Sequence, residues 1–193
     1  MLDDGPVIEQ ARRGDETAWR TLYERHSDLV FRLAVRSVGE RDAALDIVQE
    51  TFVRASRAIG GFRGDATFRS WIARIAINET RSWLRKGARK REVSLELVRD
   101  IADEARPADE AAARSQMAQR AIAFVRTLPA QQRDTVLLRT MEGYAYREIA
   151  EMLGTTEGSV RVSYHHAIRK LRAHLAGAAG GRAGERTESE RIS

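Results

Sequence analysis

Apolar side chains recur at steps of three and four along most of the chain, and this period limits the fold more than any other feature. A helix brings residues with such spacing onto one face, whereas a strand needs alternation with a period of two. The clearest run consists of Trp19, Leu22, Tyr23, His26, Leu29, Val30 and Leu33. No segment alternates convincingly, and the only prolines are Pro6, Pro107 and Pro129. The sequence therefore predicts an all-α protein.

Polar and small residues mark where the first helices begin and end. Asp15 precedes the first run and is a candidate N-cap, because its carboxylate can accept hydrogen bonds from the free amides of the first turn. A second run contains Ile47, Val48, Thr51, Phe52 and Ala55. Glycines at 60–61 and 64 then indicate a short loop, and another helix is predicted from Phe68 to about Lys86.

The distribution of charge divides the chain into two small helical domains. Residues 96–112 hold six acidic residues against two arginines, with a proline among them, and this composition is typical of a linker. We therefore expect a first domain at residues 8–90, a flexible acidic linker at 91–114 and a second domain at 115–176. The tail, residues 177–193, has almost no apolar side chains and is predicted to be disordered.

Composition excludes several classes of protein. The 193-residue chain has no cysteine, so disulfides, thiolate zinc sites and cysteine nucleophiles are excluded. No apolar run approaches the roughly 20 residues of a membrane span. The acidic start, Met1 to Asp4, lacks the pattern of a signal peptide, so we expect a cytoplasmic protein without membrane insertion. The net charge of +5 suits a nucleic-acid partner but decides little by itself.

The strongest local motif lies in the second domain and predicts a helix-turn-helix. The residues that give its first helix a buried edge are Ile149, Ala150 and Leu153. Gly154 follows where a left-handed residue ends a helix, and Thr155 or Thr156 can cap the next one, which Val160 would lock against the first. Two helices joined by such a turn form a DNA-binding pattern, although an ordinary helical hairpin has the same outline.

The second helix of this motif carries polar and basic side chains where DNA would lie. Candidate contacts to base edges are Ser159, Arg161, Ser163, Tyr164 and His165. Candidate phosphate contacts on later turns are Arg169, Lys170 and Arg172. The adjacent His165 and His166 point about 100° apart on a helix and cannot chelate one ion together, so we expect neither a metal site nor a cofactor.

A basic stripe on the helix from Phe68 offers a second nucleic-acid surface. With spacings of four, three and four, it consists of Arg74, Asn78, Arg81 and Arg85. These spacings place the four side chains on one helix face. Phe62 lies just upstream in the glycine-rich loop, and an aromatic ring beside cations suits single-strand binding by stacking. The residues alone favour the alternative that Phe62 plugs the core between helices.

An acidic patch on the preceding helix contains Asp46, Gln49 and Glu50. Two carboxylates of this kind can serve in hydrolysis, but no nucleophile, metal constellation or phosphate loop accompanies them. A protein-docking surface or a plain solvated face therefore explains the patch better than catalysis, and no catalytic residue is expected.

Together these segments resemble the sigma-70 family of RNA polymerase sigma factors, specifically its small extracytoplasmic-function (ECF) group. The motifs that carry the resemblance are Asp46–Phe52, Phe62–Gly64, Phe68–Asn78, Leu128–Pro129, Gln132–Arg133, Glu142–Tyr144, Glu148–Ala150 and Gly158–Val160. Their order and spacing match the family's regions 2 and 4 over roughly residues 8–90 and 115–173. Large sigma factors carry a further domain between these regions, where this chain has only the acidic linker.

The resemblance implies three contacts and no enzymatic activity. Region 2 binds the β′ clamp helices of core RNA polymerase, which assigns docking to Asp46, Gln49 and Glu50. Region 2 also captures a flipped base of the −10 element and contacts that element, which assigns this role to Phe62, Arg74, Asn78, Arg81 and Arg85. Region 4 meets the β flap and reads the −35 element, here through Ser159, Arg161, Ser163, Tyr164, His165 and Arg169. The implied partners are core polymerase, promoter DNA and an anti-sigma factor.

Two departures and two alternatives accompany this interpretation. Ser163 and His166 stand where family members often have arginine, which leaves the base preference of region 4 open. A stand-alone helix-turn-helix regulator would bind duplex DNA without polymerase. A helical adaptor that binds no nucleic acid would tolerate charge reversal at the basic stripe.

Overall fold

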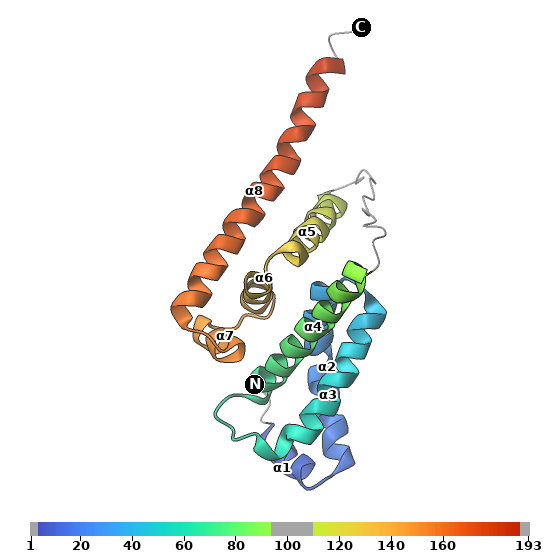
Figure 1. Cartoon of the computed structure of the whole chain (residues 1–193), viewed down its shortest axis with the longest axis vertical. Coiled ribbons are helices and arrows are strands. Elements are labelled where there is room, and N and C mark those ends of the chain that lie inside the picture. Colours follow the sequence, from blue (N-terminus) through green and yellow to red (C-terminus); the bar gives the residue numbers. More distant parts are fainter. Residues whose placement is uncertain (1–3, 94–109, 190–193) are drawn as a thin grey trace.

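The structure of the whole chain is a computed structural model, and it describes residues 4–93 and 110–189. Within these two ranges every regular element is a helix, which confirms the predicted all-α fold (Figure 1). In chain order the elements are α1 (Gly5–Arg12), α2 (Glu16–Val38), α3 (Arg41–Ala58), the 3-10 turn η1 (Ile59–Gly61), α4 (Phe68–Val93), α5 (Glu110–Thr127), α6 (Ala130–Val136), the π-helical η2 (Leu137–Met141), α7 (Tyr146–Leu153) and α8 (Glu157–Ser189).

Only the two ends of the predicted linker, residues 91–114, fall within the described ranges. Helix α4 continues to Val93, beyond the expected end near Lys86, and α5 begins at Glu110. Residues 94–109, which carry most of the acidic side chains of the predicted linker, lie outside the described residues.

Helices α2, α3 and α4 pack side by side and form the core of the N-terminal unit (Figure 1). Leu22 and Leu33 are fully enclosed as the predicted spacing requires, but Tyr23, predicted on the same face, is 44% exposed. The Asp15 carboxylate accepts hydrogen bonds from the amides of Thr17 (2.8 Å) and Ala18 (3.1 Å), which confirms Asp15 as the N-cap of α2. The bundle thereby fixes the two helices, α3 and α4, that carry the predicted docking patch and basic stripe.

Helix α1 closes one end of this bundle through polar contacts. A ring nitrogen of His26 lies 2.9 Å from a carboxylate oxygen of Asp4. Burial lowers the pKa of His26, and the hydrogen bond to Asp4 opposes this shift. Arg12 donates hydrogen bonds to the backbone carbonyls of Ile59 (3.3 Å) and Phe62. Helix α1 therefore holds both ends of the turn at the start of the glycine-rich loop.

Helices α7 and α8 form the predicted helix-turn-helix. Gly154 adopts a left-handed conformation, with a φ angle of +64°, and ends α7. The Thr156 hydroxyl accepts a hydrogen bond from the amide of Ser159 (3.2 Å) and caps α8. Val160 is fully buried and Ala150 nearly so, which locks the two helices together as the sequence predicts.

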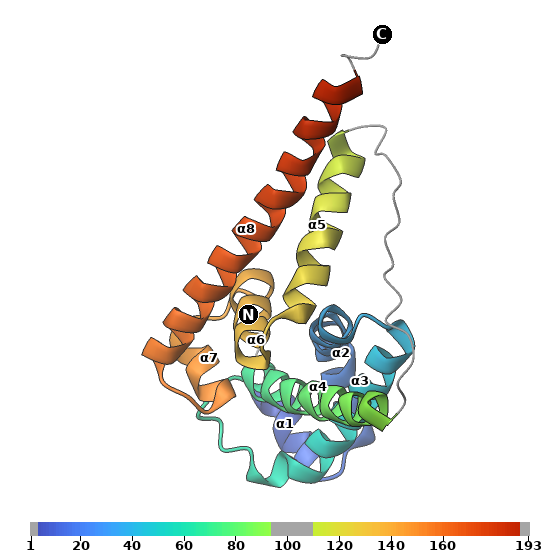
Figure 2. The same cartoon turned by 45° about the horizontal axis from the view of Figure 1, so that its top comes forward.

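The N-terminal unit, α1 to α4, and the C-terminal unit, α5 to α8, pack against each other. Helix α7 contacts α4, and both α5 and η2 contact α2. One buried apolar cluster continues through both units. Figures 1 and 2 show α5 and α8 running side by side, with α6 and α7 closer to the N-terminal bundle. The two domains predicted from the sequence are therefore present, and they are in direct contact.

Helix α8 differs from the expectation at its end. The structure extends this helix to Ser189, whereas the sequence predicts a disordered tail at residues 177–193. Alanine, arginine and glutamate in this segment favour helix, whereas its four glycines oppose it. Lengthening an existing helix requires no new nucleus. Across the described part of the chain, no helix combines the length and the apolar character that a membrane crossing requires.

Candidate nucleic-acid interface

The first turns of α8 present an exposed face on the side opposite the buried Val160 and Ala167. Its members include Arg161, Val162, His165, His166 and Arg169. This face directly follows the turn at Gly154, so the cap and the buried residues together fix which way it points. A protruding helix face of this kind fits the major groove of a duplex.

The structure separates the six predicted contacts of α8 into two groups. Arg161, His165 and Arg169 are exposed. Ser159, Ser163 and Tyr164 are half-buried, and Tyr164 packs edge-on against Tyr146 with ring centroids 5.8 Å apart. Tyr164 therefore points towards α7 in this conformation.

The sequence interpretation did not single out Val162, a residue that is 54% exposed. An exposed β-branched residue amid arginines on a recognition helix can contact the methyl group of a thymine. The exposure of Val162 could have been predicted from the helical period, because Val160 and Ala167 mark the buried side of α8.

Arg161 is held in place before any DNA binds. Its guanidinium donates hydrogen bonds to Glu157 one turn earlier, at 3.1 and 2.5 Å, and lies 4.7 Å from the ring centroid of Tyr146. The ion pair is exposed, so exchanging Glu157 for a base edge or a phosphate costs little. This arrangement restricts the side chain without burying its charge.

The basic stripe of α4 is only partly free. Arg74, Asn78 and Arg85 are exposed. Arg81 is half-buried, and its Nε lies 2.5 Å from a carboxylate oxygen of Asp134 in α6. Three of the four predicted residues therefore face outward, while the C-terminal unit neutralises the fourth.

Phe62 is not the exposed ring that stacking on a base requires. Its side chain is 8% exposed and packs against Trp71 and Phe68, with ring centroids 5.2 and 6.0 Å apart. Tilted and edge-on contacts of this kind stabilise an aromatic cluster beyond the area that they bury. This conformation corresponds to the core plug that the residues alone favoured, and the role of Phe62 at the −10 element stays a prediction.

The acidic patch of α3 lines a groove. Asp46, Gln49 and Glu50 are all exposed and border a cavity of about 400 Å³ between α3 and α4. Arg54 bridges Glu50 and Glu79, with both Nε–Oε1 distances at 2.9 Å. Burial raises the pKa of Glu79, which the positive charge of Arg54 opposes.

Further lining residues of this groove include Trp83 and Val53, the latter 41% exposed. A groove with apolar walls and an acidic rim suits a basic, amphipathic partner helix.

Residues 4–93 and 110–189 contain no cluster of three or more histidine, cysteine, aspartate or glutamate side chains arranged to hold a metal.

Comparison with protein families matches both units. Residues 22–90 match the family description Sigma-70 region 2, and residues 118–171 match Sigma-70, region 4. The chain is 32% identical over 166 residues to the RNA polymerase sigma-H factor of Pseudomonas aeruginosa, covering 82% of this chain and 86% of that protein. It is 30% identical over 170 residues to the ECF RNA polymerase sigma-E factor of Haemophilus influenzae, with coverage of 83% and 89%.

Solved structures share the fold. CnrH in complex with the cytosolic domain of CnrY is 28% identical, with a TM-score of 0.66 over 90% of this chain and 97% of that chain. The sigma factor RpoE in complex with the anti-sigma factor NepR from Bartonella quintana has a TM-score of 0.64 at 20% identity, covering 81% and 96%, and supports the fold alone.

The fold, the family matches and the relatives agree, and this chain belongs to the sigma-70 family of RNA polymerase sigma factors. Within that family it falls in the ECF group, whose members are initiation factors rather than enzymes. Its function is that of a sigma factor, which binds core RNA polymerase and directs it to promoters.

Proposed function

We propose that three surfaces of this chain divide the work of promoter recognition. The exposed α8 face carries the proposal, because it combines two cations with a β-branched side chain and a histidine on a helix that the Gly154 turn makes protrude. Arg161 and Arg169 would bind guanine edges or phosphates. Val162 and His165 would contact bases between them, so this face reads the −35 element.

The α4 stripe would contact the −10 element. Three residues of the stripe are exposed without any rearrangement, namely Arg74, Asn78 and Arg85. The two arginines would bind phosphates, and the amide of Asn78 would contact a base edge. Phe62 and Arg81 would join them only after a rearrangement, since one is buried and the other is paired with Asp134. Extruding a base costs a few kcal/mol, and stacking on an aromatic ring can return part of that energy.

The groove beside Asp46, Gln49 and Glu50 would receive the β′ clamp helices of core polymerase, and the C-terminal unit would meet the β flap. Exposed acidic residues around an apolar groove support this assignment through charge and shape.

We also propose that the chain has no catalytic step of its own, acts in the cytoplasm and is sequestered by an anti-sigma factor. Two structural neighbours, one of them a fold match alone, were solved with a bound partner, which supports the last point.

A reconstitution experiment tests the docking surface. The double variant Asp46→Lys with Glu50→Lys should bind core polymerase at least about tenfold more weakly in a pull-down titration, because attraction becomes repulsion. Run-off transcription from promoters found by sequencing transcript starts should fall in parallel. Glu24→Lys, a reversal at an exposed residue of α2, is the matched control and should leave both measurements unchanged.

The same experiment separates the alternatives. Unchanged core binding by the double variant would remove the docking role of α3. If the chain alone retains promoter duplex and gains nothing from polymerase, it acts as a stand-alone regulator. If it retains neither DNA nor polymerase, the adaptor interpretation holds.

A further inference from the structure

Tyr146, the first residue of α7, lies beside Arg161 of the exposed α8 face. The guanidinium carbon of Arg161 lies 4.7 Å from the centroid of the Tyr146 ring. The guanidinium carbon of Arg139, in η2, lies over the same ring at the same distance of 4.7 Å. A cation within about 6 Å of the centre of an aromatic face is attracted by the electrons of the ring. One tyrosine thus contacts two arginines, and one of the two belongs to the surface proposed to read the −35 element.

The Tyr146 ring is itself fixed by its neighbours. It is half-buried and meets the Tyr164 ring of α8 edge-on, with ring centroids 5.8 Å apart. Arg139 donates a hydrogen bond from Nη1 to the backbone carbonyl of Tyr144 at 2.9 Å, so the guanidinium over the ring is anchored as well. The ring therefore offers Arg161 a surface that does not have to be ordered when DNA binds.

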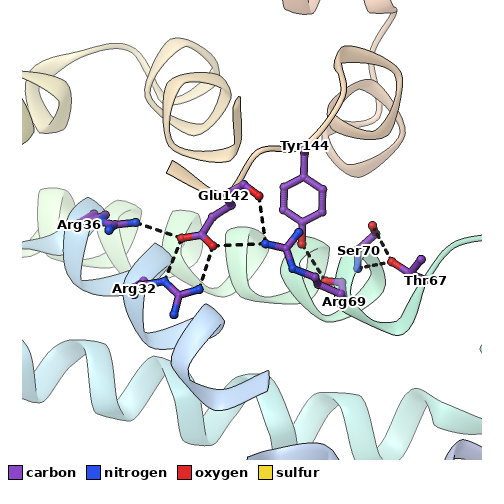
Figure 3. Close-up of polar contacts among 7 residues, drawn as sticks. All are labelled: Arg32, Arg36, Thr67, Arg69, Ser70, Glu142 and Tyr144. Atoms are coloured by element: carbon purple, nitrogen blue, oxygen red, sulfur yellow. Dashed lines mark hydrogen bonds and ion pairs between the residues drawn. The ribbon is translucent and has the colours of Figure 1, made fainter. Parts of the chain in front are cut away.

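The contacts of Tyr146 differ from those of the segment just before it. Glu142 accepts two hydrogen bonds from Arg32 of α2, at 3.1 and 2.9 Å (Figure 3). The Tyr144 hydroxyl donates to the backbone carbonyl of Arg69 in α4 at 3.1 Å. These side chains bind the N-terminal unit, whereas the ring contacts of Tyr146 come from η2 and α8 of its own unit. The arrangement around Tyr146 is therefore a property of the C-terminal unit itself.

Glu157 holds one edge of the Arg161 guanidinium. Both Nε and Nη2 of Arg161 donate to the same carboxylate oxygen, Oε1, at 3.1 and 2.5 Å. A guanidinium carries five N–H groups in one plane, so these two contacts leave the terminal edge, Nη1 and the second N–H of Nη2, for another acceptor. Two neighbouring N–H groups match O6 and N7 of a guanine in the major groove. The ring and the carboxylate together leave Arg161 one edge for recognition.

We propose that Tyr146 is a positioning residue that sets the specificity of Arg161 for a guanine in the −35 element. This role rests on the function proposed for α8. An arginine that moves freely can bind either a phosphate or a base edge, whereas one held over a ring meets DNA in one orientation. Ordering a long side chain in advance also reduces the entropy lost on binding. Tyr146 thus raises affinity and discrimination without contacting a base itself.

Two substitutions at Tyr146 separate the ring from the hydroxyl and from apolar bulk. Tyr146→Phe keeps the ring face, so binding of the holoenzyme to its preferred promoter should stay native. Tyr146→Leu keeps much of the apolar volume without a ring and should weaken this binding by about two- to fivefold, the usual worth of an exposed cation–π contact. Tyr23→Leu on α2 is the matched control, because Tyr23 is 44% exposed and lies outside the α8 surface. It should leave promoter binding unchanged.

Base specificity is the measurement that a merely structural role would not change. Binding of the holoenzyme is measured on duplexes that carry each of the four bases at every position of the −35 element. Arg161→Ala should lose discrimination at one guanine, and Tyr146→Leu should lose part of the discrimination at that same position. Tyr146→Phe should discriminate as the native protein does.

A double-mutant cycle tests whether Tyr146 acts through Arg161. In the Arg161→Ala background, Tyr146→Leu should have no further effect, because the side chain that the ring orients is already absent. A loss that adds to that of Arg161→Ala, or a loss that is equal on every duplex, would overturn the proposal. Tyr146→Phe as weak as Tyr146→Leu would also overturn it, since the effect would then belong to the hydroxyl.

NMR relaxation of the Arg161 side chain tests the arrangement in the free chain, without DNA. The order parameter of the Arg161 Nε–H bond should be high in the native chain and in Tyr146→Phe, and clearly lower in Tyr146→Leu. An unchanged order parameter in Tyr146→Leu would overturn positioning by the ring. If Arg161→Ala instead binds every duplex as the native protein does, the function proposed for α8 fails and the specificity role falls with it. The order parameter then still decides whether Tyr146 holds Arg161.

Discussion

The two surfaces proposed to read DNA differ in how accessible their residues are in the structure. In the C-terminal unit, Arg161, Val162 and His165 already project from a capped helix. In the N-terminal unit, the ring of Phe62 is buried among aromatic side chains and Arg81 is bound by Asp134. The proposed −35 surface could therefore bind without moving, whereas the proposed −10 surface would have to rearrange.

The difference corresponds to what each surface has to read. Base edges in the major groove are accessible in intact duplex, so a preformed helix face suffices. A flipped base exists only after the duplex has opened, so its pocket has no ligand until then. A side chain that stabilises the core in the meantime has two roles, and substituting it affects stability and binding together. The comparison therefore predicts separable effects in the C-terminal unit and coupled effects in the N-terminal unit.

The largest expected effect concerns Phe62. Phe62→Ala removes one of three packed rings and should lower the free energy of unfolding by about 3–5 kcal/mol. Urea unfolding followed by circular dichroism measures this loss. Phe62→Leu keeps most of the apolar volume but cannot stack, so it should cost less stability.

The leucine variant then separates the two roles of Phe62. Permanganate footprinting reports unpaired thymines in the −10 region. If the ring contacts a base, Phe62→Leu should be stable but should open the promoter less well. A pre-melted bubble template should then rescue opening only in part. Native opening by Phe62→Leu would show that Phe62 has a structural role only. The contrast between the two surfaces would then not hold at this residue.

Arg161 provides the opposite case. Arg161→Ala should leave the free energy of unfolding within about 0.5 kcal/mol, because the side chain is exposed. Promoter binding by the holoenzyme should weaken by about 1–3 kcal/mol. A base contact relaxes specificity at one position, whereas a phosphate contact weakens all promoters alike and flattens the salt dependence. Arg147→Ala on α7, where the side chain is 83% exposed, is the control. Native transcription from every promoter by Arg161→Ala would show that this helix is misplaced.

Local patterns in the sequence predicted most of the fold. The three-and-four period predicted α2, α3 and α4, and the turn motif predicted α7 and α8. The caps at Asp15, Gly154 and Thr156 lie where the local chemistry requires them. The end of α8 was predicted less well, because the near absence of apolar side chains in the tail was taken to indicate disorder, whereas the helix extends to Ser189.

The site was less predictable than the fold, because its contacts are not local. Glu142 pairs with residues 73, 106 and 110 positions away, and no period or cap in either segment indicates such partners. The burial of Phe62 likewise depends on how the loop folds back onto α4. Val162 differs from these cases, since its exposure follows from helical phase once Val160 is known to be buried.

Val162 gives the smallest expected effect and a direct test of the contact assigned to it. Val162→Ala removes two methylene-sized groups from an exposed side chain, so stability should be nearly unchanged. If Val162 contacts a thymine methyl, promoter binding should weaken by about 1 kcal/mol, and only on promoters with thymine at that position. Replacing each thymine of the −35 element by uracil removes the same methyl group from the DNA side.

The two changes together form a double-mutant cycle. Uracil at the contacted position should weaken binding by the native protein and have little further effect on Val162→Ala, because the contact is already lost. Additive losses at every position would mean that Val162 touches no thymine methyl. A coupled loss at one position would fix the register of α8 on the duplex, and the remaining exposed residues of this face could then be assigned to bases by helical spacing alone.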